Sequence, residues 1–206
     1  MKMKRSVTYL VVTGFFIALM STVGIAQDQP FKNFKDYPDH VFNPKEYIKG
    51  MQKGGHNLLI WKDPAIDLSR YSSVKIAEFG GRLLPEQNVF SYDTYIALFN
   101  SVFKSSLRLN QKESPDTLLI EGAVVECNPG SRAARYMVGF GAGKSAGAVV
   151  CEVYEPGKPN PCIRIYTRDT GSMGTFGGDS VAFLNQIFNV LATRLAATLN
   201  TTIPVK

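Results

Sequence analysis

The stretch Arg132-Ala-Ala-Arg135-Tyr136-Met-Val-Gly139-Phe-Gly141-Ala-Gly143-Lys144 separates two strand-like runs, and the rest of the chain is arranged around it. Its three glycines stand at alternate positions, and residues two apart point to the same face of a strand. A face without side chains lets another backbone or an aromatic ring pack closely. Alternatively, the glycines form a loop with unusual backbone dihedrals. The sequence leaves both interpretations open.

The basic residues of this stretch suit an anionic surface or a carboxylate-bearing partner. We therefore take seven residues as candidate binding residues: Arg132, Arg135, Tyr136, Gly139, Gly141, Gly143 and Lys144. The alternative is a solvated loop whose arginines pair with nearby acids, which is the common fate of exposed charges. A second glycine-rich loop, Gly171–Gly178, would form or flank the same surface.

Gly143-Lys144-Ser145 resembles the end of a phosphate-binding P-loop, but that motif also needs a glycine where Val138 stands. The stretch also precedes a strand and does not open a helix, so no helix N-terminus would face a phosphate. The glycine spacing does not fit a dinucleotide-binding fingerprint either. We therefore predict no cofactor.

Five runs are rich in β-branched or aliphatic residues, or alternate apolar with polar positions, as strands do. They cover residues 58–61, 74–79, 117–125, 146–154 and 162–168. The last two are separated by Pro156, Gly157, Pro159 and Pro161 and read as a hairpin.

Two segments carry apolar residues at steps of three and four, which is typical of amphipathic helices. The first spans about Tyr92 to Leu109 and has Ser91 or Asp93 as its cap; the second begins at Asp179 or Ser180 and ends near residue 201. The element order predicts an α/β fold, a two-layer sandwich with a small mixed sheet of about four to five strands covered by two main helices.

The N-terminus has the form of a signal peptide. A basic start, Met1 to Arg5, precedes an apolar run from Tyr9 to Met20, and small residues stand at Gly24 and Ala26. We predict a signal peptide over 1–26, cleaved after Ala26, and hence a periplasmic or secreted protein. A retained anchor is the alternative, although the run is shorter than the ~20 residues of a span. Membrane contact is expected only through a retained leader.

The rest of the chain divides into three parts. Residues 27–55 contain Pro30, Pro38 and Pro44 without a clear period and are predicted to form an extended linker. Residues 56–201 form a single α/β domain, and residues 202–206 form a tail.

The cysteines are Cys127, Cys151 and Cys162. Disulfides persist in an oxidising compartment, and Cys151 and Cys162 flank the hairpin loop. We predict a Cys151–Cys162 disulfide with Cys127 as a buried thiol; the alternative is three reduced cysteines. We predict no metal site, because neither His40 nor His56 stands at ligand spacing from a cysteine.

Charge and motifs limit the classes of function. The formal net charge is +6, and removing the leader's Lys2, Lys4 and Arg5 leaves +3, too little to indicate a nucleic-acid partner. No Gly-x-Ser-x-Gly elbow is present. A thiol enzyme would need Cys127 activated by a cation such as Arg132 or Arg135. The sequence therefore predicts a non-enzymatic protein.

Three segments together resemble a bacterial exported family of unknown function, whose members are commonly described as lipoproteins or periplasmic proteins. They are Asp116–Gly122, the stretch Gly130–Lys144 with its Arg-Tyr-x-x-Gly-Phe-Gly-Ala-Gly core, and Gly177–Ser180 before the last helix. The resemblance covers roughly residues 71–199. This chain departs from it in lacking a lipobox cysteine. More distantly, the element order is similar to the curli secretion-channel subunit, the lipoprotein activators of peptidoglycan synthases and the N-terminal domain of the Tol translocation protein.

These resemblances imply binding or assembly in the cell envelope. The expected partner is an envelope protein or an anionic envelope component. Two alternatives stay open: an envelope hydrolase, and an oligomeric structural subunit of a secretion-type assembly, in which the chain forms a homo-oligomer.

Overall fold

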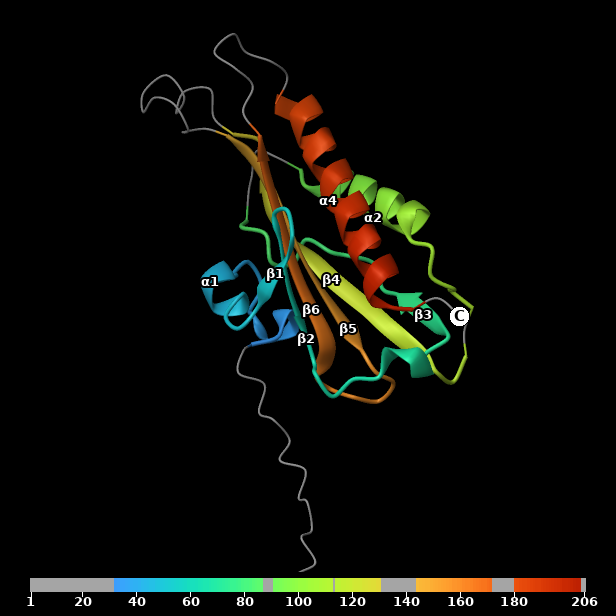
Figure 1. Cartoon of the computed structure of the whole chain (residues 1–206). Coiled ribbons are helices and arrows are strands. Elements are labelled where there is room, and N and C mark those ends of the chain that lie inside the picture. The colour runs from blue at the N-terminus through green and yellow to red at the C-terminus, as the bar shows by residue number, and fades with distance from the viewer. Residues whose placement is uncertain (1–31, 87–90, 113, 131–143, 172–179, 205–206) are drawn as a thin grey trace, which may run out of the picture.

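The computed structural model describes residues 32–86, 91–112, 114–130, 144–171 and 180–204 (Figure 1). The predicted leader, six of the seven candidate binding residues and most of the second glycine-rich loop lie outside these residues. Among the described residues, no helix has the length and apolar character needed to cross a bilayer.

A six-stranded mixed sheet forms the centre of the molecule, with the strand order β1-β2-β6-β5-β4-β3. β3 runs parallel to β4, and every other neighbouring pair is antiparallel. The strands are β1 (Gln52–Gly55), β2 (Leu58–Lys62), β3 (Ser73–Ile76), β4 (Thr117–Asn128), β5 (Ser145–Tyr154) and β6 (Pro161–Gly171). The mixed sheet is confirmed, but it has six strands where four to five were predicted.

The additional strand is β1, which lies in the segment predicted to be a linker. All four of its residues are exposed, so no alternation of apolar and polar positions marks it in the sequence. It forms because the turn before Leu58 returns the chain alongside β2, with Gln52 opposite Ile60.

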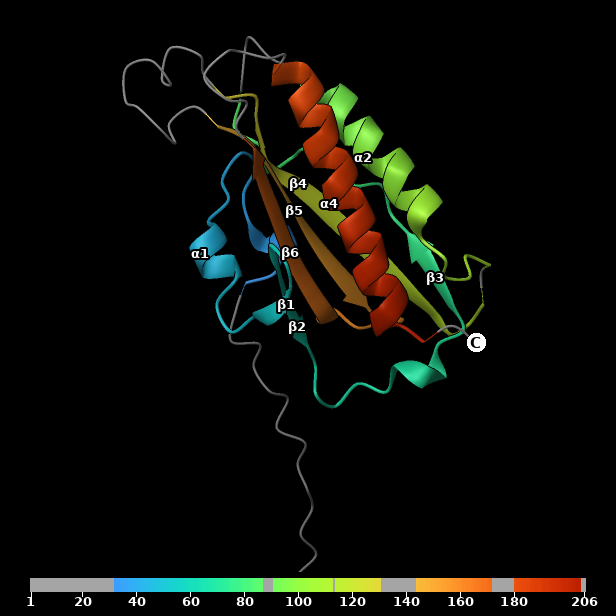
Figure 2. The ribbon, with the colours of Figure 1, turned by 45° about the horizontal axis from the view of Figure 1, so that its top comes forward.

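Two long helices, α2 (Asp93–Ser106) and α4 (Ser180–Thr202), lie side by side on one face of the sheet (Figures 1 and 2). The ring of Tyr95, in the first turn of α2, lies 5.7 Å from the ring of Phe188, the ninth residue of α4. At their ends Asn200 Nδ2 donates to the carbonyl of Ser106 at 3.1 Å, so the helices run in the same direction. The predicted pair of covering helices is confirmed.

Helix α2 ends at Ser106, earlier than the predicted Leu109. The Asn200 side chain provides the reason, because its Oδ1 accepts a hydrogen bond from the backbone N–H of Arg108 at 2.8 Å. That bond to α4 replaces the next bond within the helix, and a side chain of the partner helix therefore closes this end.

The opposite face of the sheet is covered by residues 32–51, which the sequence predicted to be part of an extended linker. They form the 3₁₀-helix η1 (Phe34–Asp36) and the short helix α1 (Pro44–Tyr47), whose first turn is capped by the Asn43 side chain. Phe34, Tyr37 and Tyr47 are buried against Val125 and Val150 of the sheet. We call residues 32–51 the N-terminal segment. It adds a third layer to the predicted two.

Strand β5 is consequently buried at all ten positions. Its odd-numbered residues Val149, Cys151 and Val153 belong to the core beneath the helices. Its even-numbered residues Ala148 and Val150 belong to the core beneath the N-terminal segment. A strand covered on both faces reads as a nearly continuous apolar run, and residues 146–151 do so.

The predicted disulfide is absent, and all three cysteines are free and buried. Cys151 lies opposite Ile165, not opposite Cys162, which is three residues nearer the hairpin turn. The prediction relied on the two cysteines flanking the hairpin loop, but the register of the hairpin does not pair them. Cys162 instead donates its S–H to the carbonyl of Val153 at 3.3 Å.

Candidate functional site

The two glycine-rich segments of the sequence are attached to the same end of the sheet. Asn128, at the end of β4, lies opposite Ala146, and Ser145 at the start of β5 lies opposite Gly171 at the end of β6. Of the seven candidate binding residues, Lys144 is described, and it is exposed directly before β5. The chain therefore brings the two attachment points together although they are far apart in the sequence.

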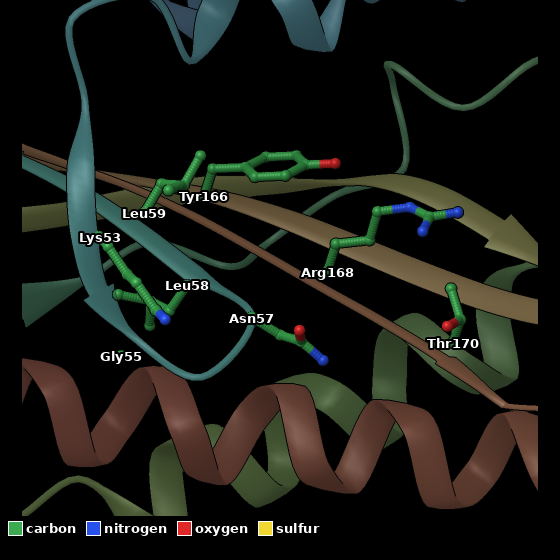
Figure 3. A pocket seen from close by; sticks show the side chains of 8 residues that line it. All are labelled: Lys53, Gly55, Asn57, Leu58, Leu59, Tyr166, Arg168 and Thr170. Atoms are coloured by element: carbon green, nitrogen blue, oxygen red, sulfur yellow. The ribbon is translucent and has the colours of Figure 1, made fainter.

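A hollow with a volume of about 360 Å³ lies beside this end, between the β1–β2 hairpin and β6 (Figure 3). Its lining combines an apolar floor with hydrogen-bonding groups and basic side chains. The lining residues are Lys53, Gly55, Asn57, Leu58, Leu59, Tyr166, Arg168 and Thr170. Thr170 is the residue before Gly171, so the hollow reaches the point where the second glycine-rich segment begins.

Strand alternation places three of these side chains in a row. Tyr166, Arg168 and Thr170 stand two residues apart on β6 and project from the same face (Figure 3). Leu59 of β2 lies directly opposite Tyr166 and continues the floor of the hollow. The sequence predicted β6 as a strand. It gave no sign of the hollow, because β1, which contributes Lys53 and Gly55 to the lining, was not predicted.

The tight turn between β1 and β2 positions the other wall. Asn57 has a φ of 54°, in the left-handed region that asparagine tolerates better than most residues. Its carbonyl oxygen accepts hydrogen bonds from the Thr167 hydroxyl at 3.0 Å and from the Arg168 N–H at 3.2 Å. These bonds join the turn to β6, which forms the opposite side of the hollow.

Charge in the hollow is partly balanced. Arg168 donates two hydrogen bonds to the carboxylate of Glu126, at 2.7 and 2.9 Å, and this pairing raises the pKa of Arg168. Burial raises the pKa of Tyr166 to about 12, so its hydroxyl stays neutral. Lys53 adds an exposed ammonium group. The lining can therefore offer an aromatic ring, hydrogen-bond donors and a positive charge to a ligand.

On the other side of β6, an ion pair ties the strand to helix α4. Arg194 Nη2 donates to Asp169 Oδ2 at 2.6 Å, and Arg194 Nη1 donates to the Thr167 hydroxyl at 3.2 Å. Asp169 also accepts the Thr170 N–H at 2.9 Å. The strand end that lines the hollow is thus held from both faces of the sheet.

A second charged pair of the sheet is buried away from the hollow. Glu152 of β5 and Arg164 of β6 lie directly opposite each other, and both side chains are fully buried. Glu152 Oε1 accepts from Arg164 Nε at 3.1 Å and from the Tyr47 hydroxyl at 3.0 Å. Its other oxygen accepts from the Tyr154 hydroxyl at 2.6 Å.

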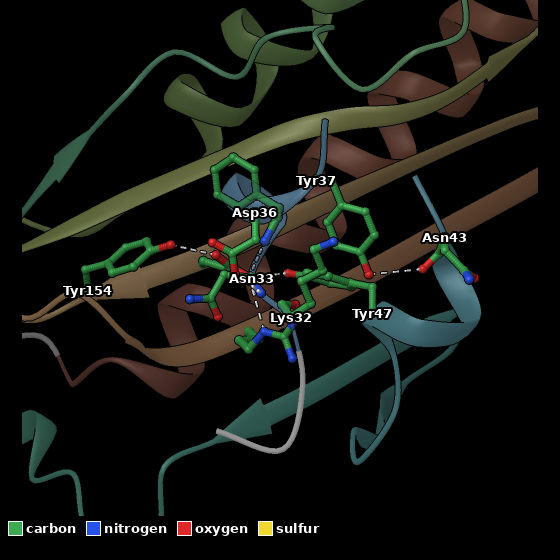
Figure 4. A network of polar contacts seen from close by, with 10 residues as sticks. Lys32, Asn33, Asp36, Tyr37, Asn43, Tyr47 and Tyr154 are labelled. Carbon is green, nitrogen blue, oxygen red and sulfur yellow. Dashed lines mark hydrogen bonds and ion pairs between the residues drawn. The ribbon is translucent and has the colours of Figure 1, made fainter. Parts of the chain in front are cut away.

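The N-terminal segment completes this network (Figure 4). The Phe34 N–H donates to Glu152 at 3.1 Å, Arg164 donates to the carbonyl of Lys32, and the Arg164 guanidinium lies 4.2 Å from the centre of the Tyr47 ring. These contacts are all internal to the fold, so the pair attaches the segment to the sheet. The sequence offered one signal for it: Glu152 stands between Cys151 and Val153, and Arg164 stands between Ile163 and Ile165.

Arg132 and Arg135, the cations that could activate Cys127, lie outside the described residues. Burial raises the pKa of the Cys127 thiol to about 12, which opposes formation of the thiolate nucleophile. His40 has its Nδ1 2.7 Å from the carbonyl oxygen of Leu84, and His56 is exposed in the β1–β2 turn. In the described part of the chain, no group of three histidine, cysteine or acidic side chains has a geometry that suits a metal.

Comparison with known proteins gives a partial family match. A family model described as a domain of unknown function, DUF4410, matches residues 99–175, from the middle of α2 through β6. The curated proteins contain no match.

Among solved structures, the chain is similar to the PelC dodecamer from Paraburkholderia phytofirmans, with 11% identity and a TM-score of 0.41, covering 68% of this chain and 96% of that one. A single-residue variant of the same dodecamer gives 12% identity and a TM-score of 0.40, covering 68% and 95%. A Xanthomonas campestris protein assigned to DUF330 gives 12% and 0.37, covering 69% and 89%. The similarity that the sequence supports is thus to a domain of unknown function, over residues 99–175.

Proposed function

We propose that this chain is a non-enzymatic binding module of the bacterial cell envelope, exported by its N-terminal leader. Its binding surface is the end of the sheet that carries the hollow and the two glycine-rich segments. The observation that supports this proposal best is the register of β4, β5 and β6, which attaches both segments beside the hollow.

The chemistry of this end fits recognition better than bond cleavage. Tyr166 and Leu59 give apolar contact area, and Asn57 and Thr170 give neutral polar groups. Ligand sites commonly combine an apolar lining with a few fixed polar groups in this way. Basic residues are also available: Lys53 and Lys144 at this end, and Arg132 and Arg135 in the first glycine-rich segment. They favour as partner an envelope protein with exposed carboxylates or an anionic envelope component.

Cross-linking in intact cells tests the proposal. A photoreactive amino acid placed at Thr170, in the hollow, should capture an envelope component; the same amino acid at Ser69, exposed in the 3₁₀-helix η2 (Leu68–Arg70), is the control. Replacing Arg132 and Arg135 with alanine should weaken the capture several-fold. Equal capture from both positions, or fractionation of the protein with the cytosol, would remove the proposal.

A further inference from the structure

The outer face of the helical layer is nearly free of charge. Helices α2 and α4 contain 14 and 23 residues, and together they carry three charged side chains: Asp93, Lys104 and Arg194. About a quarter of residues are charged in an average soluble protein. Arg194 points inward to Asp169, and Asp93 and Lys104 lie in the first and last turns of α2.

The exposed residues between these charges are small or neutral. On α2 they are Thr94, Ala97, Ser101 and Ser105, and on α4 they are Ala182, Gln186, Asn189, Val190, Thr193, Ala197 and Thr201. Helix α4 needs no such composition for docking to the sheet, because its other side carries the apolar stripe from Leu184 to Leu199. The cores of protein interfaces are likewise depleted of charged residues.

Val190 lies at the centre of this face. In the described part of the chain, two large hydrophobic side chains are exposed, Val41 at 56% and Val190 at 37%. Val190 is the eleventh residue of the 23-residue helix α4, so the uncharged positions extend about equally to both sides of it. An apolar centre with a polar surround is the usual arrangement of a protein interface.

We propose that this face binds a second copy of the chain, with α4 packing against α4 about a twofold axis close to Val190. In such a dimer the same patch meets itself. Hydroxyl and amide groups are both donors and acceptors, so Gln186, Asn189 and Thr193 can pair with their own copies. A patch of one charge sign would repel itself, whereas the exposed residues around Val190 are neutral.

The size of the face sets the expected strength. At 1.5 Å per residue and a helix width of about 10 Å, α4 and α2 present on the order of 550 Å² per copy. Burying the whole face in two copies would remove at most on the order of 1,100 Å², close to the ~1,000 Å² expected of a biological interface. The dimer should therefore be weak and reversible. This inference does not depend on the ligand-binding role of the hollow.

Sedimentation and cysteine cross-linking of the purified protein test it. The mass should rise from monomer to dimer with concentration, in the micromolar range, and Val190→Arg should raise the dissociation constant at least tenfold. Val41→Arg is the matched control, because it places the same charge at the other exposed valine. Both variants should keep the wild-type circular dichroism and melting temperature.

Because the native cysteines are buried, an introduced surface thiol is the one that reacts. Val190→Cys should give a covalent dimer on mild oxidation, and Val41→Cys, which lies outside the face, should not. A wild-type protein that stays monomeric at all concentrations would overturn the proposal. A dimer that Val190→Arg leaves intact would also overturn it. The face could instead bind another protein. In that case Val190→Arg would lose a protein captured by cross-linking in cells while the mass of the purified chain stayed unchanged, and this result would also overturn the proposal.

Discussion

Glu152 shows how much a single buried charge can depend on its neighbours. It is fully buried and accepts hydrogen bonds from Arg164, Tyr47, Tyr154 and the backbone N–H of Phe34. Removing one partner of a buried ion pair leaves an uncompensated charge and commonly costs about 3–5 kcal/mol. We therefore expect Glu152→Gln to lower the free energy of unfolding by roughly that amount, measured by urea denaturation.

The exposed pair on the same sheet provides the control. Glu126 also pairs with an arginine, but the side chains of Arg168 and Glu126 are 45% and 30% exposed. Exposed pairs contribute about 0–1 kcal/mol, so Glu126→Gln should change stability by less than that. Similar losses from both substitutions would show that burial does not determine the role of Glu152.

At the scale of elements, Arg82 helps to hold the N-terminal segment to the rest of the protein. One guanidinium nitrogen donates to the carbonyl of Tyr37 at 2.6 Å and the other to the carbonyl of Phe34 at 3.1 Å. We expect Arg82→Ala to increase hydrogen exchange of the amides of residues 34–40 by about tenfold, since three hydrogen bonds to the segment are lost, the third being to the Asp39 carboxylate at 3.1 Å.

The amides of β5 should keep their protection in this variant, because the helices still cover the strand and it stays paired with β4 and β6. Arg70→Ala, which changes an exposed arginine of η2, is the matched control and should leave exchange of the segment as in the wild type. Unfolding of the whole protein by Arg82→Ala would contradict local release of the segment.

For the whole molecule, the buried thiols predict sensitivity to alkali. Burial raises the pKa of Cys127 and of Cys162 from 9.0 to about 12. The folded state therefore favours the protonated thiol, and this stabilisation is complete below pH 9 and is lost as the pH rises toward 12. At pH 10 each thiol should reduce the free energy of unfolding by about 1 kcal/mol relative to pH 8.

Urea denaturation at the two pH values measures this change, and Cys127→Val should show a smaller loss. A thiol reagent in denaturant gives an independent check on the same residues. It should titrate three cysteines, as in the structure, whereas the disulfide predicted from the sequence would leave one. A stability that does not change between pH 8 and 10 would contradict buried, reduced thiols.

The elements with strong local patterns could be predicted from the sequence alone. Helix α4 has an apolar residue at nearly every third or fourth position, and β4 and β5 are rich in Ala, Val, Leu and Ile. Such patterns follow from the 3.6-residue and 2-residue periods of helix and strand, and these are local properties of the chain. The predictions of the α/β class and of the two covering helices relied on these local patterns.

Only the tertiary structure decided features that join distant residues. The N-terminal segment packs because Phe34 and Tyr47 reach Glu152 across more than a hundred residues, and their own neighbours carry no period. The edge strand β1 has four exposed residues and forms by pairing with β2. Two of its residues, Lys53 and Gly55, then line the hollow. The hairpin register, which separates Cys151 from Cys162, likewise depends on the packing of whole strands. Local periods fix the elements, but the partners of each element depend on contacts that no short stretch of sequence contains.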